Sequence, residues 1–203
     1  MPSTLPLQKI FTLRQLPKAA NLGTPYKASH IRFNNFWNSN VTTQSLRVPE
    51  LLAPAGSLTM LHTALNFGAT AIYAGQPRYS LRVRNNSFGD MEQLREGIDT
   101  VHAHGSKFYV GSNIYPQDAK IKAYLADMAK VVALKPDALI MADPGLIDLV
   151  RESWPEMPIH LSVQANTGNY AAVRFWRKFG IERVILSREL SLDDVAEIRQ
   201  QCP

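Results

Sequence analysis

Short apolar runs alternate with longer amphipathic segments from Val48 to the end of the chain. Each run is rich in Ala, Ile, Val and Leu, and Gly, Pro, Asn or Asp residues follow it closely, as is typical of buried strands that end at a turn. This pattern predicts six strands, near residues 48–53, 71–74, 107–111, 138–141, 159–163 and 183–186.

The segments that follow these runs place apolar residues on one face at helical spacing, which predicts helices packed against a sheet. Ser57 and Asp90 stand where helix N-caps belong, and Gly105 and Gly180 stand just past predicted helix ends. The six expected helices span about residues 58–67, 91–104, 118–133, 146–153, 170–179 and 192–201.

Six strand–helix units in a row predict the α/β class with a parallel sheet and helices outside it. An open doubly wound sheet and a β/α barrel both fit this pattern. A barrel needs eight strands to close. On the barrel hypothesis, residues 48–203 therefore form an incomplete (β/α)8 TIM-like barrel of about six parallel units, which is a partial β/α barrel.

Residues 1–47 lack this periodicity, and we expect a basic, low-order tail that is disordered. The first 48 residues hold six Lys or Arg and no acid, whereas residues 49–203 are close to neutral, so the net charge of +5 belongs to the tail. Two interpretations stay open for the tail. It resembles a transit peptide in composition, or it is upstream sequence attached by a misplaced start.

Composition restricts the classes of function. The single cysteine, Cys202, excludes an internal disulfide and any cysteine-cluster metal site within this chain, and no metal site is predicted. No apolar run is long enough to cross a membrane, so we expect no membrane association and a cytoplasmic protein. Phosphate-loop, dinucleotide, zinc-protease and serine-hydrolase motifs do not occur.

Polar side chains follow the predicted strands at the point where each strand ends. In both architectures these ends form one rim, where ligands bind. We therefore expect Asp143 and Glu189 as catalytic residues, and Asn113, Gln164 and Arg188 as substrate-binding residues. Plainer interpretations remain: Asp143 caps the next helix, Arg188 and Glu189 form a local ion pair, and His160 is a core histidine.

The loop after the second strand carries further candidates. Arg78, Tyr79, Arg82 and Arg84 combine guanidiniums with one aromatic ring, which suits a ligand that bears phosphates and flat rings. We expect these four residues to bind the substrate, and a solvated basic loop is the alternative.

Several long motifs of the chain carry a resemblance to a known family. The segments 49–56, 71–86, 137–145, 160–166 and 184–190 resemble, in the same order, peptidase family U-32, the "collagenase-like" proteins. The likeness runs from about Val48 to the end and leaves out the tail. It implies a barrel fold and, by the family name, a peptidase.

One branch of that family is associated with prephenate-dependent formation of 5-hydroxyuridine at the wobble position of tRNA. The resemblance thus implies tRNA as partner, prephenate as small-molecule co-substrate and, in full-length members, an iron–sulfur cluster. The family's cysteine signature lies downstream of the segment that matches residues 191–203. We therefore expect a truncated protein that is inactive alone. A collagenase-like peptidase and a non-catalytic RNA-binding fragment are the alternatives.

Overall fold

A curled sheet of six parallel strands organises the computed structural model, which describes residues 10–12, 48–81 and 88–202. The strands follow one another in chain order without any reversal, and each pairs in parallel with the next. They are β2 (Leu52–Pro54), β3 (Ala71–Gly75), β4 (Lys107–Ser112), β5 (Ala138–Met141), β6 (Ile159–Leu161) and β7 (Arg183–Ile185).

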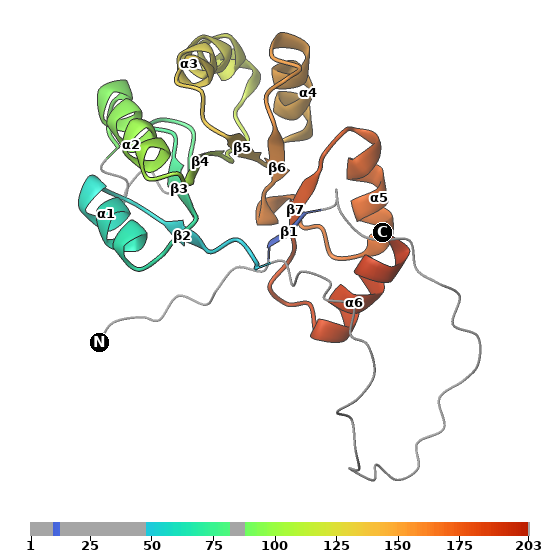
Figure 1. Ribbon diagram of the computed structural model, residues 1–203. Helices are drawn as coiled ribbons and strands as arrows, with labels where there is room; N and C mark the ends of the chain where they lie inside the picture. Colours follow the sequence, from blue (N-terminus) through green and yellow to red (C-terminus); the bar gives the residue numbers. More distant parts are fainter. Residues whose placement is uncertain (1–9, 13–47, 82–87, 203) are drawn as a thin grey trace, which may run out of the picture. The chain divides into compact units, whose positions relative to one another are not determined.

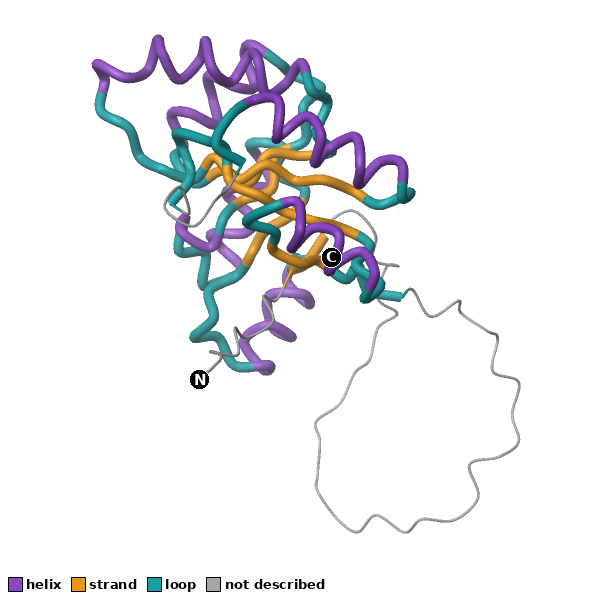
Figure 2. Tube along the Cα trace, turned by 90° about the vertical axis from the view of Figure 1, so that its left-hand side faces the viewer, coloured by secondary structure: helices purple, strands orange, loops and turns teal. Residues whose placement is uncertain are grey.

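In the described part of the chain, six α-helices lie on the outer side of this sheet (Figures 1 and 2). Because the strand order never reverses and the helices stay on one side, the partial barrel is confirmed over the doubly wound sheet. No helix of the described residues is long and apolar enough to cross a membrane. The helices are α1 (Leu58–Asn66), α2 (Met91–Ala103), α3 (Ile121–Ala133), α4 (Pro144–Ser153), α5 (Tyr170–Lys178) and α6 (Leu192–Gln201).

Strand residues alternate between two faces, as a pleated strand requires. On the convex face, Phe108, Leu139 and Leu161 pack against the helices and form the main core. On the concave face, Tyr109 and Ile140 belong to a second, smaller cluster made of residues from the strands and their ends. The larger apolar area is therefore buried under the helices, and the concave face is free to carry polar groups.

The predicted caps form as the sequence indicates. Ser57 Oγ accepts a hydrogen bond from the Met60 amide at 3.2 Å, and Asp90 Oδ1 accepts one from the Gln93 amide at 2.8 Å. At the start of α6, Ser191 and Asp194 satisfy each other's backbone amides in a capping box. These bonds to Ser191 hold the pKa of the Asp194 carboxyl below its usual value.

A short strand from the expected tail joins the sheet. β1 (Ile10–Thr12) pairs antiparallel with β7, opposite residues 183–185. Three residues of the expected tail of residues 1–47 thus pair with the sheet, and the rest of the tail lies outside the described residues. Within the described residues, β7 pairs with β6 on one side, and an extended segment pairs readily with the backbone groups of its other edge.

Candidate functional site

A small cavity lies at the carboxyl ends of the strands, and we name it the rim cavity. Its volume is about 160 Å³. The predicted residues Asn113, Gln164 and Arg188 all border it, which brings together side chains from the loops after β4, β6 and β7. The other residues that line it are Tyr73, Gly75, Ser80, Leu81, Gly111, Ile140, Ser162, Val163 and Ile185.

Two glycines make room for this cavity. Gly75 and Gly111 stand opposite each other in the β3–β4 register, near the carboxyl ends of these two strands. Neither carries a side chain, so both leave space on the concave face where they border the cavity. Asn113 lies just beyond Gly111, and its Oδ1 accepts a hydrogen bond from the Leu81 amide at 3.3 Å. The loop after β3 is thereby tied to the end of β4.

Two hydrogen bonds hold Gln164, one to its side chain and one to its backbone carbonyl. It lies in a single 3-10 turn, η3 (Val163–Ala165), and Ser162 Oγ donates to Gln164 Oε1 at 3.3 Å. The Tyr115 hydroxyl donates to the Gln164 carbonyl at 3.2 Å. Burial and then the carboxylate of Asp143 raise the pKa of Tyr115, so this hydroxyl keeps its proton at neutral pH. The Gln164 side-chain nitrogen has no protein acceptor within the described residues.

The loop after β7 is fixed to the loop after β6. Asn166 ends the 3-10 turn in the left-handed region with φ of 50°, which asparagine tolerates. Its Oδ1 accepts a hydrogen bond from Ser187 Oγ at 3.1 Å. The exposed Arg188 follows directly, at the edge of the rim cavity. The cavity thus offers amide and hydroxyl groups inside and a guanidinium at its mouth, a set that binds a flat polar ring or an oxyanion.

Other predicted residues lie elsewhere. Asp143 does not line the rim cavity; its Oδ1 caps α4 by accepting from the Leu146 amide at 2.9 Å. Glu189 is exposed and also does not line it. The expected catalytic pair is therefore not assembled in this cavity, because the strand ends turn Asp143 toward its own helix.

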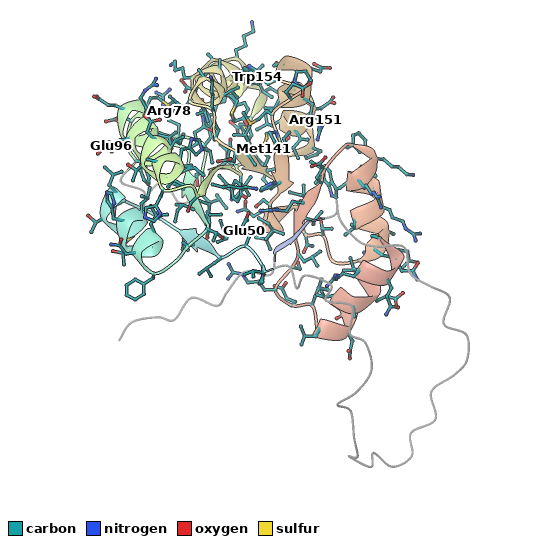
Figure 3. All side chains as sticks on the ribbon, in the orientation of Figure 1. Glu50, Arg78, Glu96, Met141, Arg151 and Trp154 are labelled. Carbon is teal, nitrogen blue, oxygen red and sulfur yellow. The ribbon has the colours of Figure 1, made fainter. Side chains whose placement is uncertain are left out.

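The loop after β3 needs a further correction. Arg78 is 72% exposed and pairs with Asp127 of α3 at 3.1 Å, among the outer helices (Figure 3). Tyr79 is only 6% exposed, and its ring packs edge-on against Tyr124 at 5.0 Å. The prediction of a base-stacking ring at Tyr79 is wrong, because the turn after β3 directs this ring into the core. Arg82 and Arg84 lie outside the described residues.

Sequence reasoning missed several residues of the rim cavity. Tyr73, Ser80 and Ser162 line it, and none of them was selected as a site residue. The alternation along strands was the available signal. Tyr73 is two residues from Ala71, and Ser162 is two residues from His160, so each shares the concave face with its neighbour.

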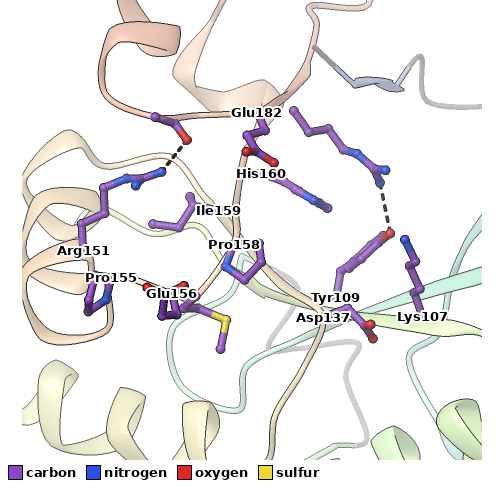
Figure 4. Close-up of a pocket in the computed structure, with 13 residues that line it drawn as sticks. Lys107, Tyr109, Asp137, Arg151, Pro155, Glu156, Pro158, Ile159, His160 and Glu182 are labelled. Atoms are coloured by element: carbon purple, nitrogen blue, oxygen red, sulfur yellow. Dashed lines mark hydrogen bonds between the residues drawn. The ribbon is translucent and has the colours of Figure 1, made fainter. Parts of the chain in front are cut away.

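A second cavity, of about 500 Å³, lies at the amino ends of the strands, and we name it the amino-end cavity (Figure 4). It includes the first residues of β4, β6 and β7, which are Lys107, Ile159 and Arg183. It is larger than the rim cavity, but it lies at the end where barrel residues ordinarily serve stability.

One polar network crosses the concave face near this cavity. Arg183 Nη1 donates to Glu50 Oε1 at 2.6 Å, and the Tyr109 hydroxyl donates to Glu50 Oε2 at 2.7 Å. Burial opposes the charge on Arg183, but the bonds and charges of Glu50 and Tyr109 raise its pKa. Burial and the bond to Glu50 raise the pKa of Tyr109 well above its usual value. The network joins Glu50, which precedes β2, to Arg183, which begins β7. β2 and β7 are the two outer strands of the parallel sheet.

His160 lies beside this network and titrates far from its usual range. Burial, and then the charges of Arg183 and Lys107, lower its pKa from 6.5 to about 3. The unfolded chain takes up this proton as the pH falls below 6.5, and the folded chain does not. Folding stability is therefore present above pH 6.5 and is lost as the pH falls toward 3.

This linkage gives a measurable prediction. Between pH 6 and pH 4.5, we expect the free energy of unfolding of the unmodified chain to fall more steeply than that of His160→Gln, by about 1.4 kcal/mol per pH unit. Urea unfolding of both proteins at several pH values measures the difference between the two slopes. Parallel pH profiles would show that His160 is protonated equally in both states.

The chain offers few ligands for an iron–sulfur cluster. Iron–sulfur clusters are held by cysteine thiolates, and Cys202 is the single cysteine of the chain. Its buried Sγ contacts the Tyr170 carbonyl at 3.5 Å. The described residues contain no group of three or more His, Cys, Asp or Glu that suits a metal ion. The residues present do not fit a cluster, and no chemical step is assigned to one.

Known proteins share both the sequence and the fold. The chain is 61% identical over 155 residues to tRNA hydroxylation protein P of Escherichia coli (strain K12), which covers 76% of this chain and 34% of that protein. It is 28% identical over 160 residues to the 23S rRNA 5-hydroxycytidine C2501 synthase of the same organism, covering 79% of this chain and 24% of that protein. The chain thus spans about a third of the length of the first of these relatives.

A solved structure shares the fold of the chain. The structure of the U32 peptidase Mk0906 superposes with a TM-score of 0.62 at 13% identity, covering 75% of this chain and 64% of that one. At this identity the likeness concerns the fold alone. The family model for peptidase family U32 matches residues 56–203, which is most of the chain. The chain therefore belongs to peptidase family U32.

Proposed function

We propose that this chain supplies the substrate-binding half-barrel of a protein that hydroxylates tRNA. The observation that carries the proposal is the 61% identity over 155 residues to tRNA hydroxylation protein P of Escherichia coli. The product under this proposal is 5-hydroxyuridine at the wobble position, with prephenate as co-substrate, in the cytoplasm. An iron–sulfur cluster would belong to parts of the full-length protein outside this chain.

The rim cavity suits one nucleobase of an RNA. Sequence-specific RNA recognition uses bases that are turned out of the stack and bound along their polar edges. The amides of Asn113 and Gln164 offer both donors and acceptors for such an edge. Arg188 at the mouth is placed to pair with a phosphate. With about 160 Å³, the cavity has room for a single ring.

Peptide hydrolysis has less support in this cavity. Ser80 and Ser162 are hydroxyl groups that line it, and a serine nucleophile needs a neighbouring base to activate it. No histidine is among the described residues that border the cavity, and His160 lies at the opposite end of the strands. A base-binding role is therefore the better interpretation of this site.

A chimaera tests the proposed function. Because the chain covers 34% of the Escherichia coli protein, residues 48–203 replace the matching segment of that protein, which supplies the remainder. The chimaera is expressed in a host that lacks tRNA hydroxylation, and its tRNA nucleosides are measured by mass spectrometry. We expect 5-hydroxyuridine to return, since the two segments share most of their residues.

The outcomes separate the alternatives. A chimaera that folds and binds tRNA but restores no 5-hydroxyuridine would favour the non-catalytic RNA-binding fragment. A chimaera that folds and binds no tRNA at low salt would contradict both RNA hypotheses, because phosphate contacts are strongest there. Gelatin cleavage by the same purified protein would favour the peptidase.

A further inference from the structure

Tyr115 is an aromatic residue that is exposed at the rim of the sheet. It lies three residues beyond the end of β4, in the loop that also carries Asn113. The residue is 56% exposed, whereas Tyr79 and Tyr124 are buried in the core. A single exposed ring is common on protein surfaces, so exposure alone does not indicate a function. What distinguishes Tyr115 is that its hydroxyl is fixed and that it stands beside the rim cavity.

The hydroxyl end of Tyr115 is fixed to two other loops. It donates to the Gln164 carbonyl at 3.2 Å, and it also lies 3.5 Å from the Ala142 carbonyl. Ala142 follows β5 and Gln164 follows β6, so one side chain from the loop after β4 reaches the ends of the next two strands. Folding has therefore already restricted the orientation of the ring. A partner that contacts this ring does not meet that ordering cost again.

The fixed ring stands beside the rim cavity and not inside it. The residues that line the cavity do not include Tyr115, but they include Gln164, which it contacts, and Asn113, two positions before it. The cavity has about 160 Å³, which is room for one ring. An RNA that places one base there leads its neighbouring nucleotides out over the mouth, where the exposed Leu81 and Arg188 also lie. The next base along the RNA therefore passes within reach of the ring of Tyr115.

Charge favours a base over a phosphate at this ring. Burial and then the carboxylate of Asp143 raise the pKa of Tyr115, so negative charge already acts at the hydroxyl end of the ring. A phosphate there is repelled, whereas the guanidinium of Arg188 at the cavity mouth attracts one. An uncharged flat base meets no such repulsion, and stacking on an aromatic side chain is a common way for proteins to hold an exposed RNA base.

We propose that Tyr115 is the stacking platform for the base next to the one held in the rim cavity. The inference rests on the proposed function, because it takes the ligand to be RNA. The ligand site then spans two successive bases, one bound along its polar edge and one bound by its face. The loop after β4 in this way supplies the aromatic ring that was expected at Tyr79 in the loop after β3.

Binding of short RNAs to the purified chain tests this contact. The RNAs are an anticodon stem-loop with uridine at the wobble position and two copies of it, each of which lacks the base on one side of that uridine. Fluorescence anisotropy at low salt gives the dissociation constants, and thermal unfolding confirms that every variant folds. In Tyr115→Leu, we expect roughly tenfold weaker binding of the intact RNA, since one stacked base is lost. Tyr115→Phe keeps the ring and should retain most of the binding.

A double-mutant cycle isolates the contact between ring and base. With the RNA that lacks the stacked base, the unmodified chain should bind about tenfold more weakly than with the intact RNA, and Tyr115→Leu should add no further loss. The matched control is Phe67→Leu. Phe67 is 83% exposed at the end of α1, shortly before β3 begins, so it lies toward the amino ends of the strands and its replacement should leave binding unchanged.

Three outcomes separate the stacking role from the proposed function. If Tyr115→Leu binds the intact RNA as tightly as Phe67→Leu does, the stacking role is wrong and RNA binding by the chain stands. If Tyr115→Leu weakens binding of the intact and the base-deleted RNAs equally, Tyr115 acts through the fold, and the stacking role is again wrong. If the unmodified chain binds none of the RNAs at low salt, both the stacking role and the proposed function are contradicted.

Discussion

Glu50→Ala is expected to lower the free energy of unfolding by about 3 kcal/mol, because it leaves the guanidinium of Arg183 buried without its carboxylate. The Arg183 side chain is 11% exposed and that of Glu50 is 22% exposed, so water replaces the lost partner poorly. The Tyr109 hydroxyl loses the same acceptor. The effect is large because one carboxylate satisfies donors from two different strands.

Two further variants serve as controls for the Glu50→Ala result. The double variant Glu50→Ala/Arg183→Met removes both charges, and we expect it to regain part of the loss, since an apolar pair costs no desolvation. Arg78→Met breaks an ion pair whose arginine is 72% exposed, and its expected effect is within about 0.5 kcal/mol. Urea unfolding gives all three values. A Glu50→Ala effect no greater than that of Arg78→Met would show that the network adds little to stability.

Gln164→Ala in the chimaera is expected to lower 5-hydroxyuridine by about tenfold to a hundredfold. The amide lines the rim cavity, and its side-chain nitrogen has no protein acceptor within the described residues, so under the proposed function it donates to the substrate. A site that hydrogen-bonds its ligand loses on the order of 1–3 kcal/mol when one partner is removed. Truncation to alanine should leave the 3-10 turn intact, because Tyr115 contacts the backbone carbonyl of Gln164.

The matched control is Gln200→Ala in the exposed part of α6, which should keep full modification. Mass spectrometry of the tRNA nucleosides measures both chimaeras at equal protein level, and thermal unfolding confirms that both fold. If Gln164→Ala retained the modification level of Gln200→Ala, the rim cavity would not be the base-binding site.

The two predicted effects concern opposite ends of the same strands. β4 carries Tyr109 near its start, and Asn113 follows its end, so one strand serves both the stabilising network and the rim cavity. Because side chains alternate along a strand, both residues and Gly111 between them belong to the concave face. Under the proposed function, stability and ligand binding are in this way separated along the strand axis.

The sequence located the rim residues better than it assigned their roles. Asn113, Gln164 and Arg188 were predicted from their places after strands, and all three line one cavity. Asp143 follows a strand equally well, but it caps α4. A residue's place along the chain determines which end of the sheet it reaches. The direction of its side chain depends on the backbone turn that follows.

Tyr79 and the Glu50–Arg183 pair mark the limit of sequence reasoning. Tyr79 stands among arginines in the chain, yet its contact is with Tyr124, which lies on α3. Glu50 and Arg183 are 133 residues apart, and no local pattern connects them. Their contact exists only because the sheet curls and brings its two end strands together across the concave face.

The sequence by itself determined the strand–helix order, the helix caps and the end of the sheet where polar residues gather, because periodicity and turn chemistry are local properties of the chain. Only the tertiary structure decided which polar groups converge, that the sheet curls rather than lies open, and that a second cavity forms at the amino ends. Those features depend on packing between segments far apart in the chain, since the curvature of the whole sheet fixes which side chains meet.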